Sequence, residues 1–254
     1  MIPPLEKRAA SARYRLLDAG EIVDTLVRLQ ARIGERFPGS GLARLADELL
    51  SISRTAAQSV AQLQRPHWPI RVAAGTLIVA MLALVVFGAS AIRTTSQVDG
   101  WAQLVQGVES AINDVVFIGV AIYFLLTIEG RIKRRRALAA LHELRSVVHI
   151  VDMHQLTKDP EWLLAGQADT ASSPERSMSP GELGRYLDYC SELLSLASKL
   201  AALFTQQLND PVVLAAVNEI ETLSGGLSSK IWQKITLLER LPAAKSAPPS
   251  PGAV

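Results

Sequence analysis

The sequence predicts an all-α membrane protein, in which two transmembrane helices join cytoplasmic helical hairpin and bundle regions. Two long uncharged runs predict the membrane helices, and apolar residues that recur every three or four positions predict the other helices. No segment shows the alternation of apolar and polar residues that is typical of strands. Of the 254 residues, 49% are apolar and 20% are charged, so the composition favours apolar segments joined to ordinary amphipathic ones.

The first uncharged run is the stronger membrane signal. It covers the 21 residues Val72–Ile92, and a helix of that length spans about 30 Å, the thickness of a hydrocarbon core. The run begins too far into the chain for a signal peptide. We therefore predict a transmembrane helix over residues 69–92.

The second run, Val115–Ile128, has only 14 uncharged residues, and alone it suits a buried core helix as well as a span. Extension back through Asp114 gives a length that can cross the bilayer. Asp114 and Glu129 then lie near the two interfaces, where a charge costs less than at the centre. A single span would put the two halves of the chain on opposite sides of the membrane, so we favour a second span over residues 111–130.

The positions of the basic residues predict the orientation. They precede the first uncharged run and follow the second, at Arg65, Arg71, Arg131, Lys133, Arg134, Arg135 and Arg136. Basic flanks belong on the cytoplasmic side, which places both termini in the cytoplasm if the membrane is a bacterial inner membrane. The run 131–136 is interpreted as a topology anchor that also meets anionic lipid headgroups. Nucleic acid is not an expected partner, because the net charge is only +2 and aromatic residues are 5%.

The predicted organisation follows from these spans and from turn-forming residues. In chain order it comprises an N-terminal cytoplasmic helical region (1–68), the first transmembrane helix (69–92), a short external loop (93–110), the second transmembrane helix (111–130), a cytoplasmic helical extension (131–156), a linker (157–179), a C-terminal helical region (180–241) and a disordered tail (242–254). The external loop is too short to fold as a sensor domain. Trp101 is expected at the interface or at the start of the second helix.

Amphipathic stripes predict a helical hairpin before the first span. They comprise Ile22, Leu26, Leu29 and Ile33, then Leu42, Leu45, Leu49, Ile52 and Ala56. A turn at Phe37-Pro38-Gly39 separates the two stripes. A third stripe follows the second span at Ala137, Leu141, Leu144, Val148 and Val151. This third stripe resembles a short coiled-coil seam, although packing within one bundle is the simpler interpretation.

The C-terminal region begins at Ser179-Pro180-Gly181-Glu182, which has the sequence of a capping box with proline at the first helical position. Its helix carries two adjacent apolar stripes, at Leu183, Leu187, Cys190, Leu194, Ala197, Ala201, Phe204 and Leu208, and at Leu193, Leu196, Leu200 and Leu203. A face this wide predicts contact with more than one helix. Asp210-Pro211 starts another helix in the same way. Gly225-Gly226 is predicted to end that helix before a last one.

No cofactor is expected, and no residues are assigned to a catalytic, cofactor or metal site. The strongest candidates for chemistry are His142, His149, Asp152 and His154. They fall close together on the cytoplasmic extension, but no histidine pair has the spacing of three or four that metal-binding helices use. Cys190 lies on an apolar stripe, so a packed thiol is favoured over a reactive one.

The leading hypothesis is a non-enzymatic protein of the inner membrane that oligomerises or binds a protein partner through its cytoplasmic helices. The alternative is an oligomeric membrane-permeabilising effector or channel gated by those helices. A lower alternative is a membrane-bound metal protein or enzyme that uses the four residues named above.

Overall fold

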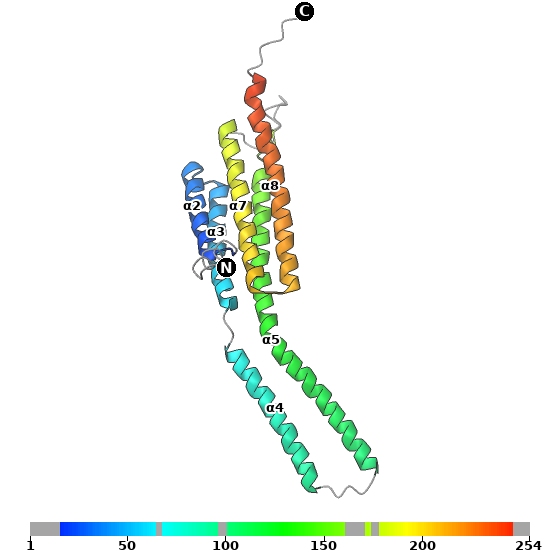
Figure 1. Cartoon of the computed structure of the whole chain (residues 1–254). Coiled ribbons are helices and arrows are strands. Elements are labelled where there is room, and N and C mark those ends of the chain that lie inside the picture. Colours follow the sequence, from blue (N-terminus) through cyan, green and yellow to red (C-terminus); the bar gives the residue numbers. More distant parts are fainter. Residues whose placement is uncertain (1–15, 65–67, 96–100, 161–170, 174–177, 246–254) are drawn as a thin grey trace, which may run out of the picture. The chain divides into compact units, whose positions relative to one another are not determined.

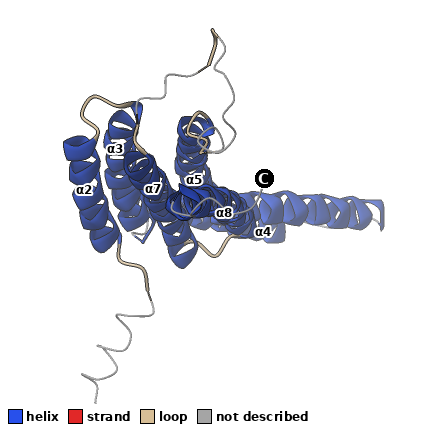
Figure 2. Cartoon of the chain, turned by 90° about the horizontal axis from the view of Figure 1, so that it is seen from above, coloured by secondary structure: helices blue, strands red, loops and turns tan. Residues whose placement is uncertain are grey.

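The computed structural model describes residues 16–64, 68–95, 101–160, 171–173 and 178–245. All regular structure in these ranges is helical and no strand occurs in them (Figure 2). The helices are α2 (Ala19–Arg36), α3 (Gly41–Gln64), α4 (Trp68–Thr95), α5 (Trp101–Leu156), α7 (Pro180–Gln207) and α8 (Pro211–Lys245). The all-α prediction is therefore confirmed for the described residues.

The chain divides into two compact units. One unit joins residues 1–62 to residues 136–254, and the other contains residues 63–135. In the first unit, α2, α3, α7, α8 and the part of α5 that follows Arg135 run side by side as a helical bundle (Figure 1). The second unit is a hairpin of α4 and the first part of α5. Helix α5 thus belongs to both units.

The N-terminal hairpin forms as predicted. The Asp18 carboxylate accepts hydrogen bonds from the backbone N–H groups of Gly20 and Glu21 at the start of α2, which satisfies donors that a helix leaves unpaired. Gly39 has a φ of 69° in the turn between α2 and α3, a conformation that glycine adopts at no steric cost. Ser40 then accepts a hydrogen bond from the Ala43 N–H at 3.1 Å. Ser40 is therefore the N-cap of α3.

The buried stripes of this hairpin match the prediction except at one position. All four predicted residues of α2 are buried, and in α3 Leu42, Leu45, Leu49 and Ala56 are buried as well. Ile52 is only half-buried, whereas Ser53 is completely buried. Ser53 tolerates this position because its hydroxyl donates to the Leu50 carbonyl at 2.8 Å, so no polar group is left unpaired.

Helix α7 forms the centre of the bundle. Its capping box is complete: Ser179 accepts from the Glu182 N–H, and the Glu182 carboxylate accepts from the Ser179 N–H. Both predicted stripes are buried up to Phe204, while Leu208 is half-buried beyond the helix end. The prediction that so wide a face contacts several helices is confirmed, because α7 packs against both α2 and α8.

Helix α8 corrects the prediction that Gly225-Gly226 ends a helix. The helix runs without a break from Pro211 to Lys245, and its buried side chains continue in register through the glycines, at Val213, Val217, Ile220, Ser224, Leu227, Ile231, Ile235 and Leu238. Each glycine costs about 1 kcal/mol relative to alanine in a helix. Packing of this long stripe against α7 outweighs that local cost.

Helix α5 is longer at its beginning than predicted. It starts at Trp101, and α4 continues to Thr95, so helix occupies much of the stretch 93–110 that was predicted as a loop. No proline interrupts either stretch, so neither contains the residue that most strongly breaks a helix. Residues 96–100 lie outside the described residues, as do most of the predicted linker and all of the predicted tail beyond Lys245.

Within the bundle, the predicted extension of α5 to residue 156 is confirmed. Its apolar stripe of Ala137, Leu141, Leu144, Val148 and Val151 is buried inside a single chain. Of the two interpretations of this stripe, packing within the bundle is therefore the correct one. The stripe is not available as a coiled-coil seam between chains.

Candidate functional site: the apolar hairpin and its charged boundary

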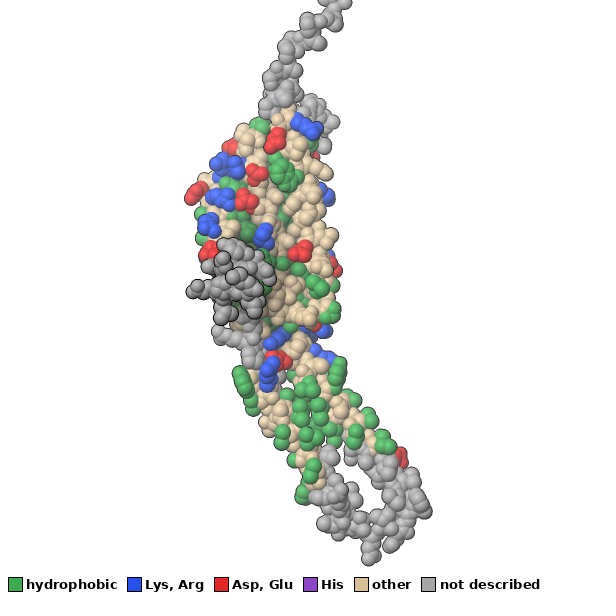
Figure 3. Space-filling view, viewed as in Figure 1, with side chains coloured by type: hydrophobic (Ala, Val, Ile, Leu, Met, Phe, Trp, Pro, Cys, Tyr) green, Lys and Arg blue, Asp and Glu red, His purple; other side chains and the backbone are tan. Residues whose placement is uncertain are grey.

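The hairpin of α4 and α5 exposes its apolar side chains. The large apolar residues that are at least half exposed in it include Trp68, Val72, Val79, Leu82, Val86, Phe87, Val115, Phe117, Val120, Tyr123 and Leu126. Hydrophobic side chains gather along the described part of this hairpin, whereas charged side chains are spread over the bundle (Figure 3). An exposed apolar surface of this extent is typical of a protein–protein or membrane contact.

A narrower set of residues in the hairpin is partly shielded from solvent. Ala74, Ile78 and Met81 are half-buried on α4, as are Ile118 and Leu125 on α5. The α4 residues are spaced by four and three positions and the α5 residues by seven, so each set lies on one face of its helix. Ala74 alone among the small residues Ala73, Ala74, Gly75, Ala80 and Ala83 lies on this face, because the others are exposed. Four of these five small residues are therefore not shielded by the hairpin.

One helical segment within the described residues has the length and composition of a membrane span. It is Val115–Leu156, and none of its most apolar window is buried. Helix α4 contributes a shorter apolar segment, Arg71–Ala83. The prediction of a membrane helix is thus supported for the second run, and the prediction of two spans is not confirmed.

A cluster of charged side chains marks one end of the hairpin. The Glu129 carboxylate of α5 binds the Arg71 guanidinium of α4, with Nε and Oε2 at 2.7 Å, and the Lys133 ammonium at 3.0 Å. Glu129 and Lys133 are each only 15% exposed. The pair between Glu129 and Lys133 has the i,i+4 spacing that brings two side chains together on one helix face. The contact with Arg71 was not predicted, because it depends on how two distant segments pair.

The four candidate residues for chemistry do not share one site. His142 and His149 are exposed on α5. Asp152 accepts a hydrogen bond from the Gln155 amide at 2.6 Å. His154 lies on another side of α5, where its imidazole occupies the space that a side chain on Gly41 would need.

His154 is nevertheless electrostatically distinct. Burial lowers its pKa from the ordinary value of 6.5, and the nearby positive charges of Arg44 and Lys158 lower the pKa further. The neutral imidazole is therefore favoured. In the described part of the chain, no group of three or more His, Cys, Asp or Glu side chains is placed to hold a metal ion, so this set gives no geometric support to the metal hypothesis.

Cys190 is a packed core residue, as predicted. Its side chain is completely buried, and burial raises the pKa of the thiol to about 12, an effect that the charge of Lys234 partly opposes. A thiol that stays protonated is a poor nucleophile. The interpretation of a packed rather than reactive thiol therefore agrees with the structure.

Sequence reasoning did not find the role of Lys234. Its ammonium donates to the backbone carbonyl and to the side-chain oxygen of Gln155, at 2.9 and 2.8 Å. Gln155 is buried and lies one residue before the end of α5. A positive charge at a helix C-terminus is favoured by the helix dipole, so Lys234 ties α8 to the end of α5.

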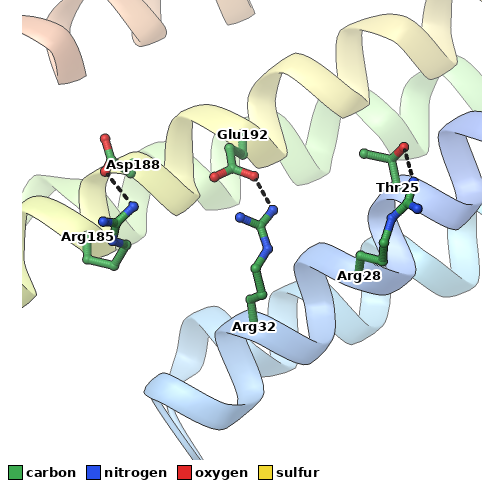
Figure 4. Close-up of polar contacts among 6 residues, drawn as sticks. All are labelled: Thr25, Arg28, Arg32, Arg185, Asp188 and Glu192. Atoms are coloured by element: carbon green, nitrogen blue, oxygen red, sulfur yellow. Dashed lines mark hydrogen bonds and ion pairs between the residues drawn. The ribbon is translucent and has the colours of Figure 1, made fainter.

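Three ion pairs lie on the surface of the described part of the bundle. Arg32 of α2 binds Glu192 of α7 at 2.6 Å, and Arg185 pairs with Asp188 within α7 (Figure 4). Arg145 of α5 binds Glu219 of α8 at 2.7 Å. Exposed ion pairs of this kind contribute little to stability, and none of the three points to a site for chemistry.

The apolar hairpin with its charged boundary is therefore the candidate functional site. No protein-family model, no curated protein and no solved structure matches this chain.

Proposed function

We propose that the chain is a non-enzymatic membrane protein with two spans, over residues 69–92 and 111–130, whose helical bundle oligomerises or binds a protein partner. The exposed apolar hairpin is the single observation that carries this proposal. Exposing apolar surface to water costs roughly 25 cal/mol of free energy per Å². Lipid chains remove that cost because they surround the surface with apolar groups. Backbone groups of a helix are satisfied internally, as a bilayer requires.

The end of the hairpin supports the same proposal. Glu129 and Lys133 lie at the boundary between the apolar part of α5 and its basic run, and Arg71 lies at the corresponding boundary of α4. Charged residues near the ends of spans are tolerated far better than charges at the centre. In this proposal the two helices share one boundary, and the N-terminal and C-terminal parts of the chain lie on the same side of the membrane.

The binding role rests on apolar side chains that the bundle leaves exposed. The apolar stripes of α7 and α5 are buried inside the bundle, so they are not accessible to a partner. The large apolar residues that remain exposed on the bundle helices include Ile150, Met153 and Leu156 of α5 and Val212, Leu214 and Trp232 of α8. Aromatic and methionine side chains are enriched in interfaces, so Met153 and Trp232 are the first residues to test.

The test is the mass of the protein in mild detergent, measured by light scattering corrected for bound detergent. We expect a discrete oligomer, or a monomer that crosslinks to one partner in native membranes. Met153→Ser with Trp232→Ser is expected to reduce that association, and Ser146→Ala with Ser229→Ala serves as a matched surface control. A monomer that yields no crosslinked partner would contradict the binding role. Ion flux through liposomes that contain the oligomer would instead favour the channel hypothesis.

A further inference from the structure

The charged end of the hairpin carries a net positive charge. Within the hairpin unit the cluster consists of Arg71, Arg131, Lys133, Arg134 and Arg135 around the single carboxylate of Glu129. We call these five cationic residues the basic collar. Arg71 and Lys133 bind Glu129 directly, which leaves a formal charge of +4 on the collar and its carboxylate together.

Two arginines of the basic collar face outward. Arg131 and Arg135 are exposed and one helical turn apart, so they lie on the same side of α5. In the described part of the chain, neither forms an ion pair with a carboxylate. The Arg131 guanidinium lies over the Phe124 ring at 5.1 Å, which holds it beside the exposed apolar surface.

Glu129 does not neutralise these two side chains, because it is only 15% exposed and binds Arg71 and Lys133. A guanidinium offers a planar pair of N–H donors that matches two oxygens of a phosphate. Each outward arginine can therefore bind a phosphodiester at the end of the apolar part of α5.

We propose that the outward arginines of the basic collar, Arg131 and Arg135, bind the phosphate of an anionic phospholipid headgroup and so select anionic lipid around the hairpin. The occupant is a lipid rather than a soluble anion, because the site adjoins a surface of exposed apolar side chains that acyl chains would cover. A basic residue near an anionic leaflet is worth about 1 kcal/mol, roughly a fivefold preference. This inference rests on the proposed membrane insertion of the hairpin.

The experiment uses the full chain in liposomes of neutral lipid that contain a trace of spin-labelled lipid. The motionally restricted part of the spectrum measures lipid in contact with the protein, and comparison of labelled phosphatidylglycerol with labelled phosphatidylcholine measures selectivity. We expect at least about a threefold preference for the anionic lipid in the wild type.

The variants separate the basic collar from general charge. Arg131→Gln with Arg135→Gln is expected to reduce the preference to near parity, and Arg131→Lys with Arg135→Lys to restore part of it. Arg54→Gln with Arg240→Gln removes the same charge from exposed positions on the bundle and should leave the preference unchanged. Replacement of chloride by inorganic phosphate at equal ionic strength should also have no effect.

The outcomes distinguish this inference from the proposed function. A restricted signal from the neutral lipid without selectivity would keep the membrane anchor and overturn the lipid site. Equal losses in the collar and bundle variants would overturn it too, as would competition by inorganic phosphate. The absence of a restricted signal from every lipid would overturn membrane insertion itself and this inference with it.

Discussion

At the scale of single residues, burial decides the chemistry. Cys190 is completely buried, and the pKa of His154 is lowered by its burial and by the positive charges of Arg44 and Lys158. Such environments disfavour the charged form of a side chain. Both residues therefore report on the integrity of the bundle rather than on a reaction.

The first prediction concerns the thiol of Cys190. Because its pKa is raised to about 12 and it is enclosed, we expect it to react with a thiol reagent at pH 8 only after the bundle unfolds. Reaction rates measured with and without denaturant check this, and Ser229→Cys, at an exposed position, provides the control. Rapid labelling of the folded wild type would show that the bundle is open around α7.

The second prediction concerns pH. A histidine whose pKa is lowered by folding contributes stability that is complete above its ordinary value of 6.5 and is lost as pH falls through the lowered pKa. We expect the midpoint of thermal unfolding to fall between pH 7 and pH 5, and to fall less in His154→Gln. Circular dichroism in mild detergent measures both, and identical slopes would contradict the role assigned to His154.

Contacts between residues close in sequence could be predicted, whereas contacts between distant residues could not. The caps at Ser179 and Asp210 were predictable, because a cap binds backbone groups two or three residues away. The ties between Lys234 and Gln155 and between Arg71 and Glu129 were not, because each joins residues more than fifty positions apart. Local pattern carries no information about such pairs.

At the scale of helices, long-range packing overrides local propensity in α8. Gly225 and Gly226 are exposed within a continuous helix, and a Cβ atom added to either would meet nothing within 4 Å. The prediction of a helix end at the glycines was wrong, because the apolar stripe keeps its helical spacing across them. The same periodicity correctly predicted the buried faces of α2, α5 and α7.

The third prediction follows from that continuity. Gly225→Ala and Gly226→Ala should each stabilise the bundle by about 0.5–1 kcal/mol, because alanine loses less backbone entropy in a helix. Gly39→Ala should instead destabilise it by about 1 kcal/mol, since Gly39 has a positive φ. Chemical denaturation of the three variants in detergent compares them. Destabilisation by the α8 substitutions would indicate a helix break at that position.

At the scale of the whole molecule, the chain combines a bundle with a complete apolar core and a hairpin with an exposed apolar surface. Both parts were predictable from the sequence. Long runs without charged residues indicated the hairpin, and apolar residues that alternate with charged ones at helical spacing indicated the bundle. The number of spans is harder to derive. The first run is longer in sequence, yet the segment of described residues that meets the criteria for a span lies in α5.

The most direct test of the two-span account is a map of which side of the membrane each part of the chain faces. Single cysteines are placed at Ser51, Ser96 and Ser229, with the wild type as the blank, and treated with a membrane-impermeant maleimide in sealed vesicles of known orientation. We predict that Ser96→Cys reacts on the opposite side from Ser51→Cys and Ser229→Cys. Reaction of Ser51→Cys and Ser229→Cys on opposite sides would show a single span, and reaction of all three on one side would show none.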